Sequence, residues 1–249
     1  MNDNKTSKNS IVAKFAVPIS FLILFFLAAN FTDCDLVTFW KRRNHLTDLV
    51  VDMIPPDFSY IQKILLPLFY TIQMSVTGTV LGTFFALVLS PFGAANLGFP
   101  AVIRRILRIV IQILRSFPAL ILALTATFLF GLGTFAGTFA ITLYTFAIMA
   151  KLTYEDASAA DVKAYQALRA MGVSKYVAYI HGILPEIIPG FLTNALYLLE
   201  TNVRHSSILG YVGAGGIGLL LNEKISWLEY DKVGTILLML FLTVCVIEY

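Results

Sequence analysis

The residues most capable of chemistry lie close together near position 200. Glu200 and Arg204 stand four residues apart, so in a helix they share one face and form an ion pair. His205, Ser206 and Ser207 follow directly. This order suggests a hydrolase, but a serine nucleophile needs a base and an oxyanion hole on a rigid frame, and neither GxSxG nor HExxH occurs in the sequence. We therefore predict that the chain is not an enzyme and has no catalytic residue.

The glycines from 213 to 218 form a second motif. Their sequence, GAGGIG, satisfies the GxGxxG pattern of dinucleotide-binding turns. Such a turn needs a complete βαβ unit with an acidic residue about 20 positions later, whereas only one further apolar segment follows here. Glycine instead permits close helix packing. No GxxxxGK[ST] loop and no His/Cys cluster occurs, so we predict no cofactor, no metal site and no ATP site on this chain.

Arginine near a membrane span suggests transport rather than catalysis. A guanidinium donates two parallel hydrogen bonds to a tetrahedral oxyanion, and ionisable groups in or near membrane spans are functional candidates by default. The candidate substrate pathway therefore consists of Glu200, Arg204, Ser206 and Ser207. The alternative carries equal weight at this point: Glu200 and Arg204 merely neutralise each other at a membrane boundary.

The elements that position these residues are predicted to be membrane helices. The chain has 249 residues, of which 58% are hydrophobic and 13% charged, and its mean hydropathy is +0.79. These values are typical of integral membrane proteins. No charge occurs in 64–103 or in 116–150, and each run exceeds the roughly 20 apolar residues that cross a bilayer. The net charge of +3 is spread along the chain, so membrane lipid is the expected surrounding and nucleic-acid binding is not supported.

We predict an all-α integral membrane protein with about six spans. Residues 1–60 would hold an N-terminal anchor helix and an external segment, since no small-residue cleavage site follows the first apolar stretch. Residues 61–249 would form the core domain. Gly131 and Gly133 break one long apolar run into a hairpin, and Pro91 and Gly93 end the preceding helix. The predicted spans are 14–31, 66–90, 105–130, 133–151, 183–203 and 233–248.

The largest internal loop, near residues 152–182, is predicted to be cytoplasmic. With the N-terminus inside, eleven of the 18 Lys and Arg residues fall on the cytoplasmic side and seven outside, which is the expected bias. Within the loop, Ala164, Ala167, Leu168 and Met171 recur at i, i+3, i+4 and i+7. This spacing predicts a short amphipathic helix with an apolar face of small residues.

Three residues predict how this helix continues. Gly172 would stop it at a left-handed position, Ser174 would cap the next helix, and Pro185 would open the following span. Two helices joined at a fixed bend are therefore expected. A helix lying on the membrane surface is the alternative, but an alanine-rich face buries little area in lipid and lets another protein approach closely.

The spacing of this loop resembles the cytoplasmic EAA loop of ABC-importer permeases. That pattern is Glu-Ala-Ala, three residues, Gly, and then Leu-Pro twelve residues later; here Gln replaces the Glu and Leu the second Ala. In that family the loop forms a coupling helix that docks into a groove of the ATPase subunit. The resemblance implies an ATPase-coupling role for Gln166, Ala167, Leu168, Gly172, Leu184 and Pro185.

Longer stretches between residues 50 and 247 are similar to the phosphonate-transport permeases. They include LRSFPALILAL, GLGTFAG and LETNVRHSSILGYVGAGGIG. Ala119 stands where the resemblance leads us to expect Glu. The resemblance implies a type I ABC-importer permease fold and a homodimer in the plasma membrane of a prokaryote. It also implies a cytoplasmic ABC ATPase partner, an extracytoplasmic substrate-binding protein, and import of phosphonates or related phosphorus oxyanions such as phosphite and phosphate.

One rival interpretation stays open. A secondary transporter or a channel for a small anion would move its substrate without ATP. Secondary transporters carry ionisable ligands at the middle of the membrane and inverted repeats. The charge-free central spans of this sequence argue against that class.

Overall fold

The computed structural model describes residues 4–32 and 40–248, and no β-strand occurs in these two ranges. The chain divides into two compact units, Met1–Asp52 and Met53–Tyr249. The described part of the first unit consists of α1 (Asn4–Phe31) and α3 (Arg43–Asp52). The apolar stretch of α1, Pro18–Ala29, is shorter than a membrane span, so the anchor helix and the division at residue 60 stay predictions.

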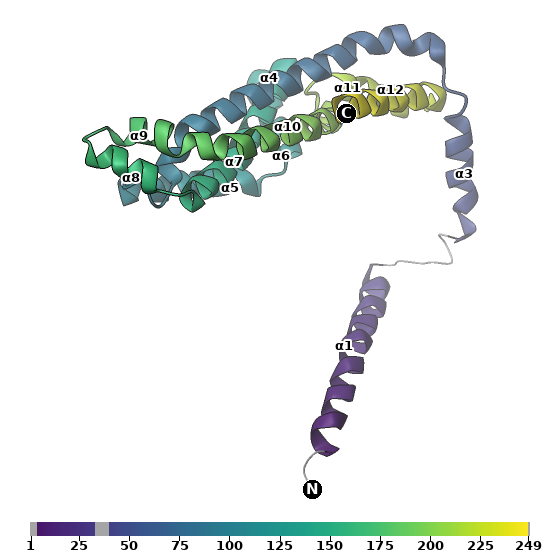
Figure 1. The fold of residues 1–249 in the computed structure, drawn as a ribbon. Coiled ribbons are helices and arrows are strands. Elements are labelled where there is room, and N and C mark those ends of the chain that lie inside the picture. Colours follow the sequence, from purple (N-terminus) through teal and green to yellow (C-terminus); the bar gives the residue numbers. More distant parts are fainter. Residues whose placement is uncertain (1–3, 33–39, 249) are drawn as a thin grey trace. The chain divides into compact units, whose positions relative to one another are not determined.

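The second unit is built around two long helices that pack along their lengths (Figure 1). They are α4 (Ile61–Gly93) and α7 (Thr134–Ala159). Their contact is close because α4 presents glycine to α7. A Cβ added at Gly78 would lie 2.7 Å from the Ile141 side chain, and one at Gly82 would lie 2.8 Å from the Thr142 carbonyl oxygen. Small residues allow this approach of helices in an apolar surrounding, where van der Waals packing drives association.

Three single helices of the described residues are long and apolar enough to cross a membrane. They are α4 together with the short helix η1 (Phe58–Tyr60), α7, and α12 (Tyr230–Glu248). Two bent pairs raise the number to five if each pair is one span. The first pair is α5 (Ala101–Ser116) with α6 (Ala119–Phe130), and the second is α9 (Lys175–Gly182) with α10 (Leu184–Leu209) and η2 (Gly210–Val212).

The prediction of one helix over 105–130 is wrong. α5 and α6 are separate helices bent by 95°, because Pro118 disfavours a helical conformation at the preceding residue. Phe117 is extended, with φ −88° and ψ 126°. α5 is amphipathic and is held on the end of α4: Arg108 Nε donates to the Gly93 carbonyl oxygen at 2.9 Å, and its guanidinium lies over the Tyr154 ring.

The predicted breaks around the remaining helices are confirmed. α6 ends at Gly131, with φ +84°, and α7 follows Gly133, with φ +139°. α4 ends at Gly93. Three helices of the second unit lie outside the predicted spans: α8 (Lys163–Ala170), α9 and α11 (Ile217–Ser226).

Candidate functional site

The turn between α8 and α9 has the geometry that its sequence predicts. Gly172 has φ +85° and no atom within 4 Å of an added Cβ. Its N–H donates to the Arg169 carbonyl oxygen at 3.1 Å, and the Val173 N–H donates to the Leu168 carbonyl oxygen at 3.2 Å. These two bonds form a Schellman motif, which needs a left-handed residue after the helix. The predicted glycine stop is confirmed.

The start of α9 and its junction with α10 also follow the prediction. The Ser174 side chain accepts a hydrogen bond from the Val177 N–H, so Ser174 caps α9. Pro185 lies in the first turn of α10, where the missing N–H costs no helical hydrogen bond. α9 and α10 meet at an angle of 68° next to Leu184.

Two buried tyrosines fix α8 and α9 to the rest of the second unit. The Tyr165 hydroxyl donates to the Leu97 carbonyl oxygen at 2.7 Å, and the Tyr179 hydroxyl lies 2.9 Å from Ser90 Oγ at the end of α4. Both side chains are at most 5% exposed. Burial raises the pKa of Tyr165. Close packing of Tyr165, Tyr179 and Ile183 in one apolar cluster makes the two helices a rigid block.

The opposite side of α8 faces outward. Ala164, Ala167 and Gln166 are exposed, and Met171 is 71% exposed. Leu168 differs, because it packs partly buried against the cluster around Tyr165. The rigid block thus presents a shallow surface of small and flexible side chains next to the Gly172 turn. Such a surface suits contact with another protein.

The predicted ion pair on α10 is present, and its arginine is accessible. The Arg204 guanidinium contacts the Glu200 carboxylate. The Arg204 side chain is 52% exposed, whereas that of Glu200 is 16% exposed. The arginine is therefore the more exposed partner of the pair, and the carboxylate reduces its local charge.

The two serines beside Arg204 bond within the protein. Ser206 is fully buried, and its Oγ lies 2.7 Å from Ser75 Oγ on α4 and 2.8 Å from the Asn202 carbonyl oxygen. Ser207 is partly buried, and its hydroxyl donates to the Arg204 carbonyl oxygen at 2.6 Å. Ser206 therefore takes part in helix packing in this conformation.

A buried polar seam between α4, α7 and α10 escaped prediction. Asn202 Nδ2 donates to Thr79 Oγ1 on α4 and to Thr145 Oγ1 on α7, at 2.8 Å each. Asn202 Oδ1 is buried and has no hydrogen-bond partner in the described residues. One signal was visible, because hydroxyl residues recur every fourth position on one stripe of α4. These residues are Thr71, Ser75, Thr79 and Thr83.

The glycine-rich segment is a packing device rather than a nucleotide site. Gly213, Gly215 and Gly216 have positive φ values between 70° and 80°. The Gly133 N–H donates to the Gly213 carbonyl oxygen at 2.9 Å, which joins the segment to the turn between α6 and α7. No strand precedes it in the described residues, so the βαβ unit of a dinucleotide site is missing.

A charged cluster surrounds Tyr60, at the start of α4 and therefore at the end of this helix opposite α9. The ammonium groups of Lys63, Lys224 and Lys232 lie 5.4–5.6 Å from the centre of the buried Tyr60 ring. Glu229 bridges Lys224 and Lys232 with oxygen–nitrogen distances of 2.9 Å. The hydrogen bond from Lys232 and then that from Lys224 lower the pKa of Glu229, and the bond to Glu229 raises the pKa of Lys224.

Comparison with known proteins extends these observations. The chain is 30% identical over 214 residues to the phosphite transport system permease protein PtxC of Stutzerimonas stutzeri, an alignment that covers 86% of this chain and 78% of that protein. It is 32% identical over 197 residues to the phosphate-import permease protein PhnE of Mycolicibacterium smegmatis, where the alignment covers 79% of this chain and 37% of that protein.

The fold is that of known ABC-transporter permeases. A chain of the MetNI methionine ABC transporter in an inward-facing conformation superposes with a TM-score of 0.67 at 22% identity, covering 77% of this chain and 94% of that one. A chain of an amino acid ABC transporter gives a TM-score of 0.60 at 16% identity, covering 78% of this chain and 95% of that one.

The profile of one protein family matches residues 78–247, which is more than half of the chain. Its members are non-enzymatic transport subunits, and the family implies an ATPase partner and a substrate-binding partner. With this family match, a helical fold shared with known permeases and relatives among transport permeases, the chain belongs to the family of binding-protein-dependent transport system inner membrane components and is the permease component of an ABC importer.

Proposed function

We propose that the chain forms the membrane-spanning part of an ATP-driven importer for phosphonates or related phosphorus oxyanions, such as phosphite and phosphate, in the plasma membrane of a prokaryote. The observation that carries the substrate class is the 30–32% identity to a phosphite and a phosphate permease over most of this chain. An accessible arginine on α10 supports it, because a guanidinium binds a tetrahedral oxyanion through two parallel hydrogen bonds.

The α8–α9 block is the proposed docking site of the cytoplasmic ATPase. Gln166 and Ala167 would contact the ATPase on the outward side of α8, Leu168 would hold α8 in place from its partly buried side, and the Gly172 turn would set the angle of approach. Leu184 and Pro185 would pass the movement to α10, since they lie at the bend between α9 and α10. Each chain supplies one such block, so a homodimer embedded in lipid would serve two ATPase subunits.

The outer half of α10 is the proposed substrate pathway. Arg204 would attract an anion, and Glu200 would keep it from being trapped, since a strongly bound anion leaves slowly. Ser207 would add a hydroxyl donor. Ser206 would reach the anion only after leaving Ser75, so its contribution would require a movement of α10 relative to α4.

Uptake of radiolabelled methylphosphonate tests the pathway, normalised to the amount of intact complex purified from the same membranes. Arg204→Ala should nearly abolish uptake, whereas Arg204→Lys should lower it, because lysine keeps the charge but lacks the planar fork. Glu200→Gln tests whether the ion pair has only a structural role. If it has, Glu200→Gln should impair assembly of the complex as much as Arg204→Ala does. Wild-type uptake per complex by Arg204→Ala would remove the arginine from the pathway.

The orientation of the block can be tested separately. Single cysteines at Ser174 and Ser59, in a variant without Cys34 and Cys245, should react oppositely with a membrane-impermeant maleimide in intact cells. Position 59 should be labelled and position 174 protected. Labelling of position 174 from outside would contradict docking of a cytoplasmic ATPase on α8.

A further inference from the structure

A small polar cavity of about 120 Å³ lies between α5 and α7. This volume is several times the roughly 30 Å³ that one water occupies in the liquid, and it is well below the about 300–1,000 Å³ of sites for drug-sized ligands. It therefore suits a small ion. We call this space the inner cavity, and its lining residues are Ile111, Gln112 and Arg115 of α5 and Lys151 and Tyr154 of α7.

The polar lining of the inner cavity consists of hydrogen-bond donors that are accessible. The side chains of Arg115 and Gln112 are exposed, and neither takes part in a hydrogen bond or an ion pair in the described residues. The Tyr154 hydroxyl also lacks a partner there, and it is not fully buried although Tyr154 is only 7% exposed. A guanidinium, an amide and a phenol therefore keep unused donors around this space.

The charges around Tyr154 are mostly positive. The Lys151 ammonium lies 3.4 Å from the Glu155 carboxylate, so these two partly offset each other. The Arg108 guanidinium lies over the Tyr154 ring, 4.9 Å from its centre. Together with Arg115, these groups make three cations and one carboxylate, and no acidic side chain of the described residues lines the cavity itself. The excess of positive charge favours an anion.

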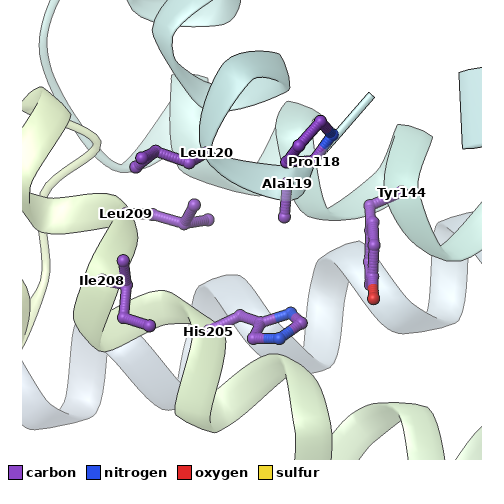
Figure 2. A pocket seen from close by; sticks show the side chains of 7 residues that line it. All are labelled: Pro118, Ala119, Leu120, Tyr144, His205, Ile208 and Leu209. Carbon is purple, nitrogen blue, oxygen red and sulfur yellow. The ribbon is translucent and has the colours of Figure 1, made fainter. Parts of the chain in front are cut away.

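The inner cavity lies between the candidate pathway residues and the α8–α9 block along α7. Figure 2 shows the Tyr144 ring of α7 near His205, which follows Arg204 on α10, and the two ring centres are 5.3 Å apart. Lys151 follows Tyr144 by seven residues, which is about two helical turns, or about 10 Å, further along the same face of α7. The cavity is therefore on the side of Arg204 that leads to the proposed ATPase-docking block.

A lipid headgroup offers the same phosphate chemistry, but the geometry of α5 favours a free ion. Six aliphatic side chains of α5 are between 45% and 69% exposed and form the surface that acyl chains would contact: Val102, Ile103, Ile106, Ile109, Val110 and Ile113. Ile106 precedes Arg115 by nine residues, which places them about 180° apart around the helix. A lipid bound by its headgroup at Arg115 would have to lead its acyl chains around α5 to reach this surface.

We propose that the inner cavity is a second binding site for the transported phosphorus oxyanion, which holds the ion after it passes Arg204 and before its release to the cytoplasm. The guanidinium donates two parallel hydrogen bonds, and the ammonium, amide and phenol supply further donors. Glu155 competes with the ion for Lys151, so binding stays weak enough for release. The inference rests on the proposed function and deepens it, because it adds a second station to the path.

Occupancy of the inner cavity is measured with a cysteine at position 112. Gln112→Cys, in a variant without Cys34 and Cys245, is purified as the complex with its ATPase and reacted with a maleimide in the absence of nucleotide. Phosphite or methylphosphonate should slow the reaction in a saturable manner, because a bound ion covers position 112. Chloride at the same ionic strength should not. A short-chain phosphatidylglycerol is the lipid probe and should protect less than phosphite does.

The charge of the site is tested by uptake of radiolabelled phosphite into liposomes that hold the complete transporter. Arg115→Gln should lower uptake about tenfold or more, as expected for lost hydrogen bonds to a charged group. Arg115→Lys should lose less, because it keeps the charge. Arg105→Gln is the matched control on the same helix: Arg105 is exposed and does not line the cavity, so uptake should stay within about twofold of wild type.

A further pair of variants separates ion binding from a structural role of Lys151. Glu155→Gln frees the Lys151 ammonium, so phosphite should protect position 112 at lower concentrations. Lys151→Gln should weaken this protection. If Lys151 served only to pair with Glu155, both variants would lower the yield of monodisperse complex alike and leave the protection unchanged, and this result would overturn the role of Lys151 in the site.

The outcomes distinguish this inference from the proposed function. A wild-type transporter that takes up neither phosphite nor methylphosphonate would overturn both. Wild-type uptake without protection of position 112 by either ion, or with Arg115→Gln as active as wild type, would overturn the inner cavity alone. Protection by phosphatidylglycerol but not by phosphite would also overturn it, and would assign the cavity to a lipid headgroup.

Discussion

The α8–α9 block and the crossing of α10 with α4 are held together in different ways. The turn of the block is fixed by neighbours in the sequence: the Gly172, Val173 and Ser174 bonds join residues three to five positions apart. The crossing is fixed by hydrogen bonds between residues far apart in the sequence, 131 positions for Ser75 with Ser206 and 123 for Thr79 with Asn202. The block leaves one surface free, whereas the crossing has its polar groups turned inward.

This difference suits two roles in one transport subunit. A block that moves as a unit can receive force from a partner, because its packed core resists deformation. The crossing depends on buried hydrogen bonds in an apolar surrounding. Few other arrangements of the two helices are stable, because burying an unpaired polar group there costs free energy. Movement of the α8–α9 block would therefore act on the start of α10, while the other half of α10 is held in one position against α4. Four predictions test this contrast.

The largest effect is expected where α11 crosses α10. A Cβ added at Gly218 would lie 2.0 Å from the Ser207 carbonyl oxygen, which is backbone and cannot rotate away. Gly218→Ala should therefore prevent recovery of a folded chain, measured as monodisperse protein after detergent extraction. Gly190→Ala on α10 is the control, since no atom lies within 4 Å of its added Cβ and alanine favours a helix. A folded Gly218→Ala protein in normal yield would refute the close crossing.

The second effect concerns function rather than folding. Gly172 has φ +85° but open space around it, so Gly172→Val should cost only roughly 1–2 kcal/mol of backbone strain. The variant should insert and assemble, yet lose substrate-stimulated ATP hydrolysis because the turn is distorted. Gly172→Asn should retain most of it, since asparagine tolerates left-handed geometry. Wild-type stimulation in Gly172→Val would remove the basis for calling α8–α9 the coupling element.

The same contrast explains what the sequence could predict. The stops at Gly131 and Gly172, the Ser174 cap and the Pro185 start were predicted because each depends on the conformational preference of one residue and its neighbours. The break at Pro118 was missed, although proline marks it, because the segment had the length and hydropathy of one span. The meeting of Asn202 with Thr145 was not predictable from spacing, because it depends on how three helices dock.

The buried seam should give an intermediate effect. Asn202→Leu keeps a similar volume but removes both hydrogen bonds to the threonines on α4 and α7. Interhelical hydrogen bonds in membrane proteins contribute about 0.6–2 kcal/mol each, so the melting temperature of the detergent-solubilised complex should fall. Thr145→Val alone should have a smaller effect, and the double variant should show non-additivity. Additive losses would mean that the two side chains do not interact.

The smallest effects are expected from two carboxylates that lie outside the candidate membrane spans, Glu229 and Asp161. Near Tyr60, the bond from Lys232 lowers the pKa of Glu229. At the start of α8, the Lys163 N–H donates to the Asp161 carboxylate at 3.0 Å and lowers the pKa of Asp161. Each carboxyl group has a lower pKa in the folded state than in the unfolded state. It therefore stabilises the fold fully at pH values above its unfolded-state pKa, which is about 4.3 for Glu and about 3.9 for Asp. The stabilisation disappears as the pH falls through the folded-state value.

Melting curves of Glu229→Gln and Asp161→Asn against wild type, recorded from pH 7 to pH 3, test this. Each variant should melt slightly below wild type at pH 7, and the difference should vanish at the acid end. Salt should separate the two sites. The Glu229 contribution comes from ion pairs and should shrink in 1 M salt, where the screening length is about 3 Å. The Asp161 contribution depends first on a backbone N–H and should persist. Equal salt sensitivity of the Glu229 and Asp161 contributions would contradict this, because it would mean that Asp161 acts through the charge of Lys163. The start of α8 would then be held by an ion pair, as the Tyr60 cluster is, and not by its local backbone geometry.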